Sequence, residues 1–63
     1  MAERLMKYYA VVEKEGGFSA KVKLATMTKL PSTRAAVAPD SPENIDAFRK
    51  AYEAILGKAA PSL

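Results

Sequence analysis

Neither cysteine nor histidine occurs among the 63 residues of the chain. A domain of this length buries only about 60% of the surface that it exposes when unfolded, and many such domains need a disulfide or a metal for stability. Without cysteine there is no disulfide or zinc–thiolate site, and without histidine the commonest general base and nitrogen ligand are missing. The sequence therefore predicts one domain that is held together by packing alone, binds no metal or cofactor and is not an enzyme.

The first segment has the apolar spacing of an amphipathic helix. At about 100° per residue, one arc is formed by Ala2, Leu5, Met6, Tyr9 and Val12. Gly16-Gly17 supplies the stop that is expected at a helix C-terminus. We predict a helix from about Ala2 to Glu15, with Tyr9 in the core and Tyr8 accessible at the edge of the arc.

The last segment has a helix start, an apolar stripe and a helix stop. Ser41 can cap a helix that begins at Pro42, because proline is well tolerated at the first helical position. The stripe that follows is formed by Ile45, Phe48, Tyr52, Ile55 and Leu56. Gly57 ends the pattern, so we predict a helix over about 42–56 in a domain of residues 1–58, with a flexible tail over 59–63.

The middle segment is compatible with either a strand or a helix. Apolar and polar residues alternate from Phe18 to Leu24, as in a half-buried strand, which would have to pair with residues 8–13 as a hairpin. As a helix, the same segment has two apolar arcs, one of Phe18, Val22 and Ala25 and one of Ala20, Leu24 and Met27. Because two strands alone are marginally stable, we favour a helix over about 18–29.

These segments predict an all-α fold, a small orthogonal bundle of three helices. A short helical turn over 31–38, capped by Ser32 or Thr33, is compatible with it, since Pro39 and Pro42 prevent a longer helix. The alternative is an α+β fold in which a hairpin of residues 8–13 and 18–25 precedes the C-terminal helix.

The expected core is small and leads to the main functional prediction. Its large apolar residues are Leu5, Met6, Tyr9, Val12, Phe18, Val22, Leu24, Met27, Leu30, Val37, Ile45, Phe48, Tyr52, Ile55 and Leu56. Three short helices cannot easily cover both arcs of the middle segment, and self-association or docking on a larger protein would complete the core. We predict a non-enzymatic interaction module, either a homo-oligomer or an accessory subunit of a larger complex.

The excess positive charge lies in the middle of the chain. The net charge is +3, and residues 16–39 contain Lys21, Lys23, Lys29 and Arg34 but no acidic residue. Four unopposed cations could contact the phosphates of a nucleic acid, which makes nucleic-acid binding the second functional hypothesis.

One ten-residue stretch, Leu24 to Thr33, resembles the helix-turn-helix element of bacterial transcription regulators. In that family a Leu-Ala pair, a T-G-L-P turn and an S-T cap precede the recognition helix. The resemblance implies that Ser32, Thr33 and Arg34 lie near base edges, and on the DNA-binding hypothesis we expect Lys21, Lys23 and Lys29 to contact phosphates. Lys29 stands where the family has its turn glycine, and Pro39 limits the second helix to about seven residues.

The hairpin alternative leads to a different family. A strand pair followed by the helix PENIDAFRKAYEAIL resembles the order of elements in HicB-type antitoxins, which have a further strand before the helix. This resemblance implies an antitoxin function.

The first segment is too polar to target or insert the chain. Its longest apolar run, Tyr8 to Val12, has five residues, whereas a signal peptide needs about 7 to 15 apolar residues and a membrane span roughly 20. We therefore expect no membrane association and a cytoplasmic location.

Overall fold

The computed structural model describes residues 3–63, which form three helical elements. These are α1 (Glu3–Thr28), α2 (Ser32–Ala35) and α3 (Pro42–Leu56). Residues 3–63 contain no strand, so the predicted all-α fold is confirmed and the hairpin of residues 8–13 and 18–25 is wrong. Both of those segments lie in α1, where helical spacing brings side chains from successive turns onto one buried face.

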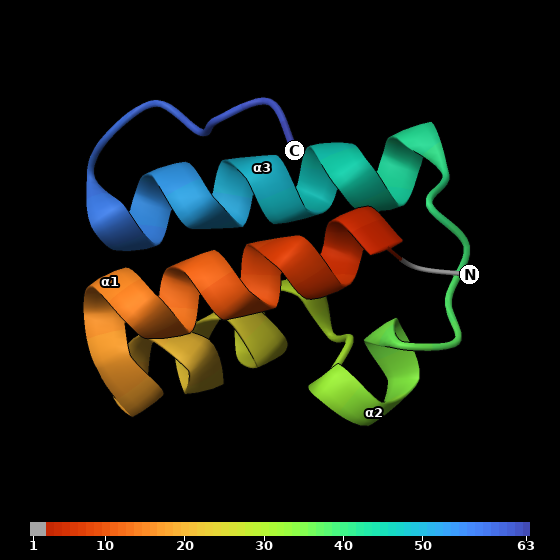
Figure 1. The fold of residues 1–63 in the computed structure, drawn as a ribbon, viewed down its shortest axis with the longest axis horizontal. Helices are drawn as coiled ribbons and strands as arrows, with labels where there is room; N and C mark the ends of the chain where they lie inside the picture. Colours follow the sequence, from red (N-terminus) through yellow and green to blue (C-terminus); the bar gives the residue numbers. More distant parts are fainter. Residues whose placement is uncertain (1–2) are drawn as a thin grey trace.

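α1 consists of two helices that meet at Gly17. This residue has φ 77° and ψ −170°, a combination that is essentially restricted to glycine because a Cβ would clash with the backbone. The chain reverses there, and the second half of α1 returns behind the first (Figure 1). The two predicted helices of about 2–15 and 18–29 are therefore confirmed, although Ala2 lies outside the described residues.

Gly16 is required for a different reason, the close approach of neighbouring groups. A Cβ at this position would lie 2.5 Å from the Cβ of Ala20 and 3.2 Å from the Cδ2 of Leu56. No side chain fits there unless the backbone around Ala20 moves and the Leu56 side chain shifts as well. The Gly-Gly pair thus permits both the backbone reversal and the tight packing beside it.

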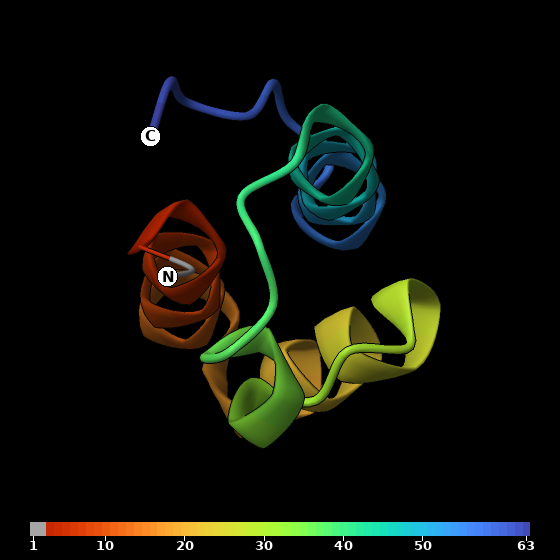
Figure 2. The same cartoon turned by 90° about the vertical axis from the view of Figure 1, so that its right-hand side faces the viewer.

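The helices surround one core. Seen end-on, the first half of α1, α3, and the second half of α1 together with α2 occupy three corners of a triangle (Figure 2). The first half of α1 and α3 run side by side in the same direction (Figure 1). The residues buried between these helices are Leu5, Tyr8, Tyr9, Val12, Ala20, Leu24, Ala35, Phe48, Ala51 and Tyr52.

Aromatic rings hold α1 against α3. The ring centroids of Tyr9 and Phe48 are 5.6 Å apart at an interplanar angle of 71°, and those of Tyr8 and Tyr52 are 6.2 Å apart at 68°. Such edge-to-face pairs contribute about 0.5–1.5 kcal/mol beyond the burial of their area. Tyr8 is only 3% exposed, so the prediction that it is accessible is wrong. The parallel packing of α3 places Tyr52 and Phe48 over it.

Five of the residues predicted for the core are exposed instead, and these are Met6, Phe18, Val22, Met27 and Val37. Spacing alone cannot say which of the two apolar arcs of the middle segment faces inward. In the structure Ala20 and Leu24 of one arc are buried, and the small side chain of Ala20 permits the close approach beside Gly16, whereas Met27 of the same arc is 52% exposed. The arc that contains Phe18 and Val22 consequently faces outward.

Two side chains near the start of α3, those of Ser41 and Asp40, accept hydrogen bonds from the free N–H groups at the N-termini of α3 and α1. Ser41 accepts a hydrogen bond from the Asn44 N–H (3.3 Å), and Gly57 (φ 69°) ends α3, as predicted. The N–H groups of Arg4 and Leu5 donate to the carboxylate of Asp40, at 3.1 and 3.4 Å. The loop before α3 therefore caps α1 from a distant part of the chain.

α2 begins without a side-chain cap. Its N-cap residue is Pro31, whose carbonyl accepts from the N–H groups of Arg34 and Ala35 at 2.9 and 2.8 Å. Ser32 lies inside the helix, so the predicted capping by Ser32 or Thr33 is wrong. The extended backbone of Pro31 (ψ 162°) already orients its own carbonyl to start the turn.

The tail of residues 59–63, which the sequence predicts to be flexible, lies against the core. Ala60 donates its N–H to the Glu53 carboxylate (3.2 Å), and the Tyr8 hydroxyl donates to the Pro61 carbonyl (3.5 Å). Ala60 and Leu63 are partly buried.

Replacing Gly17 with alanine is expected to destabilise the fold by about 1–3 kcal/mol, because a Cβ is strained at φ 77° with ψ −170°. The measurement is urea unfolding followed by circular dichroism. Ser19→Ala, an exposed change two residues further on, is the control and should stay within about 0.5 kcal/mol of the wild type. Equal stability of Gly17→Ala and the wild type would show that the reversal does not need glycine.

Candidate interaction surface

The six residues predicted to contact nucleic acid lie in the second half of α1, the turn after it and α2. They are Lys21, Lys23, Lys29, Ser32, Thr33 and Arg34. Lys21 is partly neutralised, because its Nζ lies 3.9 Å from the Oε1 of Glu13. The other three basic side chains are exposed and make no ion pair with any carboxylate in the described part of the chain. Three uncompensated cations thus remain in this region.

The turn between α1 and α2 has part of the geometry that the helix-turn-helix resemblance implies. Lys29 adopts φ 59°, the left-handed conformation of the family's turn glycine. The Tyr9 hydroxyl donates to the carbonyl of Leu30 and fixes the turn to the first half of α1, and burial raises the pKa of Tyr9. However, α2 has only four residues, and at 1.5 Å per residue it is about 6 Å long. The reading of bases by Ser32, Thr33 and Arg34 stays a prediction.

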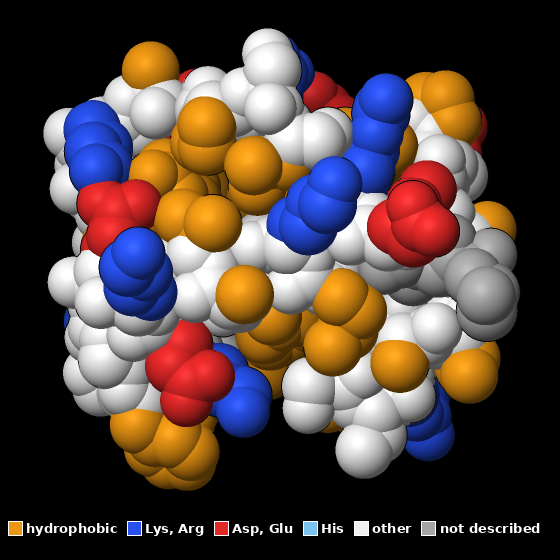
Figure 3. All heavy atoms as spheres, in the orientation of Figure 1, with side chains coloured by type: hydrophobic (Ala, Val, Ile, Leu, Met, Phe, Trp, Pro, Cys, Tyr) orange, Lys and Arg blue, Asp and Glu red, His pale blue; other side chains and the backbone are white. Residues whose placement is uncertain are grey.

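After Gly17, α1 carries several apolar side chains on the side that faces away from the core. At about 100° per residue, the exposed positions are neighbours around the helix and cover roughly half of its circumference. These positions, which we call the outer face, are Phe18, Ser19, Val22, Lys23, Thr26 and Met27. Phe18 is 71% exposed, Val22 47% and Met27 52%. Figure 3 shows apolar side chains projecting at the lower left, where Figure 1 places the reversal of α1.

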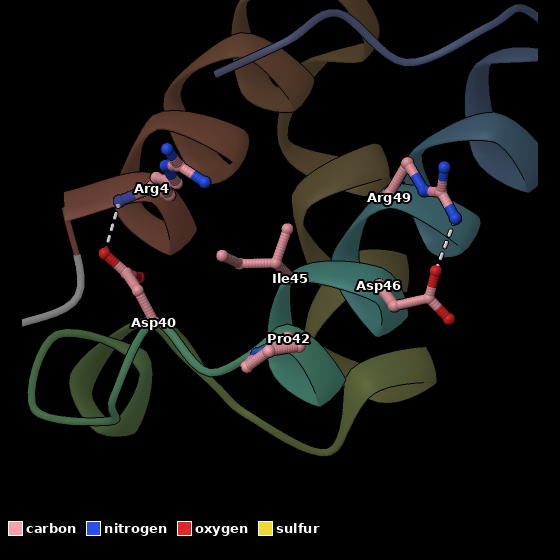
Figure 4. Close-up of a pocket in the computed structure, with 6 residues that line it drawn as sticks. All are labelled: Arg4, Asp40, Pro42, Ile45, Asp46 and Arg49. Atoms are coloured by element: carbon pink, nitrogen blue, oxygen red, sulfur yellow. Dashed lines mark hydrogen bonds and ion pairs between the residues drawn. The ribbon is translucent and has the colours of Figure 1, made fainter.

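A hollow of about 430 Å³ lies between the start of α1 and α3 (Figure 4). It is lined by Arg4, Asp40, Pro42, Ile45, Asp46 and Arg49. Its charges are largely compensated, because Asp46 pairs with Arg49 and, at 3.1 Å, with Lys50, while Asp40 accepts from the α1 N-terminus. Hydrogen bonds from Lys50 and Arg49 lower the pKa of Asp46. Asp40 thus joins the loop before α3 to the start of α1, and Asp46 is paired within α3.

A polar cluster joins the reversal of α1 to the end of α3. Tyr52 donates its hydroxyl to the Oε2 of Glu15 (3.0 Å), and the Lys58 ammonium group pairs with Oε1. The hydrogen bond from Lys58, followed by that from Tyr52, lowers the pKa of Glu15. Burial raises the pKa of Tyr52, and donation to Glu15 raises it further. Sequence spacing gave no signal for this cluster, because its members are 37 and 43 residues apart.

Neither a metal-binding cluster nor a membrane-spanning helix is found in the part of the chain that the structure describes. Within residues 3–63 no group of three or more Asp or Glu side chains could hold a metal ion. No helix among the same residues combines the length and the apolar character that crossing a membrane requires.

The Glu15 cluster makes stability depend on pH. A carboxyl whose pKa is lower in the folded chain stabilises it fully above the unfolded value of 4.5, and this contribution is lost as pH falls through the folded pKa. Glu15→Gln should therefore be less stable than the wild type at about pH 7, and the difference should shrink towards about pH 3. Urea unfolding at both pH values measures this difference.

Lys58→Gln is the partner control, since it removes the same ion pair from the other side. Its difference from the wild type should shrink over the same pH range. A stability difference between Glu15→Gln and the wild type that does not change with pH would rule out a folded-state role for the Glu15 carboxylate.

No family model matches this chain, and comparisons with curated proteins and with solved structures found no significant similarity.

Proposed function

We propose that this chain is a small, non-enzymatic interaction module that binds a protein surface through the outer face of α1. It would act as a homo-oligomer or as the accessory subunit of a larger complex, and the cytoplasm is its proposed location. The observation that carries the proposal is the exposure of Phe18, at 71%, on the same helix stripe as Val22.

The exposure of these side chains follows from the way the core is filled. α1 after Gly17 has two apolar arcs, and the arc with Ala20 and Leu24 already occupies the space against the first half of α1 and α3. Phe18 and Val22 point the opposite way, so within residues 3–63 they are left largely uncovered. A second surface would cover the outer face.

The energy available from such a contact is large enough to matter. Full burial of a Phe, Val or Met side chain contributes about 1.5–3 kcal/mol, and these three are already partly covered, so burying the remainder could contribute on the order of 3–5 kcal/mol before the costs of association. The second half of α1 is only about 16 Å long, which is short for a standard interface of about 800 Å² on each partner. These magnitudes favour a small interface with an apolar centre.

DNA binding is the second candidate function. It is favoured by the three uncompensated cations Lys23, Lys29 and Arg34 and by the left-handed turn at Lys29. The single helical turn of α2 offers little surface to a DNA groove. Binding that is lost when salt is raised would support this candidate.

The double change Phe18→Ser with Val22→Ser should abolish association without unfolding the chain. Phe18 is mostly exposed and Val22 about half exposed, and neither belongs to the core, so the free energy of unfolding should change by about 0.5 kcal/mol per site. The measurement is co-purification of tagged chains from extract of the source cells, together with light scattering on the purified chain. Val37→Ser, at a residue that is 82% exposed in the turn after α2, is the matched control and should retain association.

Both supporting outcomes require that the double variant loses the association. A purified wild type that self-associates then supports the homo-oligomer, and a monomer that co-purifies with a fixed partner supports the accessory subunit. A wild type that is monomeric and co-purifies with nothing would contradict the proposal.

A further inference from the structure

We infer that the surface recognised by the outer face is an apolar surface edged by carboxylates on a different protein, and not a second copy of this chain. This inference rests on the proposed function and identifies the chemistry of the partner. It follows from the charges on and around the outer face.

The outer face is cationic as well as apolar. Around the helix, Lys23 lies between Val22 and Met27. Lys29 is the first residue after the end of α1. Neither ammonium group has a carboxylate within ion-pair distance in residues 3–63, and the sequence from Gly16 to Pro39 contains no acidic residue. A surface that covers the whole outer face, from Phe18 to Met27, therefore lies against Lys23 and ends beside Lys29.

A symmetric dimer would bring like charges together. In a two-fold dimer the same patch lies on both sides of the interface, so Lys23 and Lys29 of each copy would face a surface with the same cations and no acid. Ions screen charges only beyond about 8 Å at physiological ionic strength, and screening is weaker inside an interface. Like-charge contacts of this kind disfavour a partner.

Contact with another part of a second copy is also poorly supported, because few carboxylates of this chain are available. Five of its seven acidic residues already hold a partner within the chain, and these are Glu13, Glu15, Asp40, Asp46 and Glu53. The remaining two are Glu3 and Glu43, each in the first turn of a helix. A second copy therefore offers few carboxylates to complement Lys23 and Lys29, which favours a different protein as the partner.

A protein partner accounts for the face better than a nucleic acid does. Phosphate groups would satisfy the two cations but would bury little of Phe18, Val22 and Met27, and the aliphatic side chains of Val22 and Met27 cannot stack on bases as aromatic rings do. A helix with an apolar stripe flanked by Glu would satisfy both features. At 1.5 Å per residue, a helix of about 11 residues matches the length of the second half of α1.

The test uses a pair of peptides of about 14 residues that form amphipathic helices, one with Glu flanking a Leu stripe and one with Lys at every Glu position. Amide NMR of the full chain follows the titration at physiological salt. The Glu peptide is expected to shift the amides of residues 18–29 and to bind about tenfold more tightly than the Lys peptide. Lys23→Glu with Lys29→Glu should reverse this preference, and Lys50→Glu, on α3, should leave it unchanged.

Four results would overturn the inference. The first is a Lys peptide that binds as tightly as the Glu peptide. The second is a titration in which neither peptide shifts the amide signals of residues 18–29, and the third is a short DNA duplex that binds more tightly than the Glu peptide. The fourth is a wild-type dimer that Phe18→Ser with Val22→Ser converts to a monomer. That dimer would support the proposed interaction function while excluding the heterologous acidic partner, so the two failures are distinguishable.

Discussion

The backbone reversal at Gly17 is the constraint on which the rest of the structure depends. Without it, residues 3–28 would form one long helix, and its two ends could not contribute to the same core. With it, Tyr9 and Leu24 are buried in one cluster with Phe48 of α3. Gly16 adds the close approach to Leu56 that brings the end of α3 against this reversal, and Glu15, Tyr52 and Lys58 connect the same two regions by polar contacts.

The reversal also determines what is left exposed. Once the arc of Ala20 and Leu24 faces the core, the arc of Phe18 and Val22 must face outward, because the two arcs lie on opposite sides of one helix. The bundle closes its core with small residues, namely Ala20, Ala35 and Ala51, rather than with these larger ones. The exposed Phe18 and Val22, beside the unpaired Lys23, are the basis of the proposed contact with another protein.

Much of the fold could be predicted because the decisive signals are local. The Gly-Gly stop, the Ser41-Pro42 start and the Gly57 stop each act within a few residues, and the apolar spacing between them is helical. The features that the sequence did not predict depend on contacts between distant residues. The capping of α1 by Asp40 joins positions 35 and 36 residues apart, and the burial of Tyr8 depends on where α3 lies. The cationic segment was visible in the sequence, whereas the pairing of Lys21 with Glu13 depends on the reversal.

The most direct test is the contact between the two halves of α1 in solution, measured by nuclear Overhauser effects between the Tyr9 ring and Leu30. These effects are expected, because the Tyr9 hydroxyl donates to the Leu30 carbonyl across the reversal. In one continuous helix the two residues would be about 30 Å apart, so their absence from a folded, helical chain would contradict the reversal, and with it the core and the outer face.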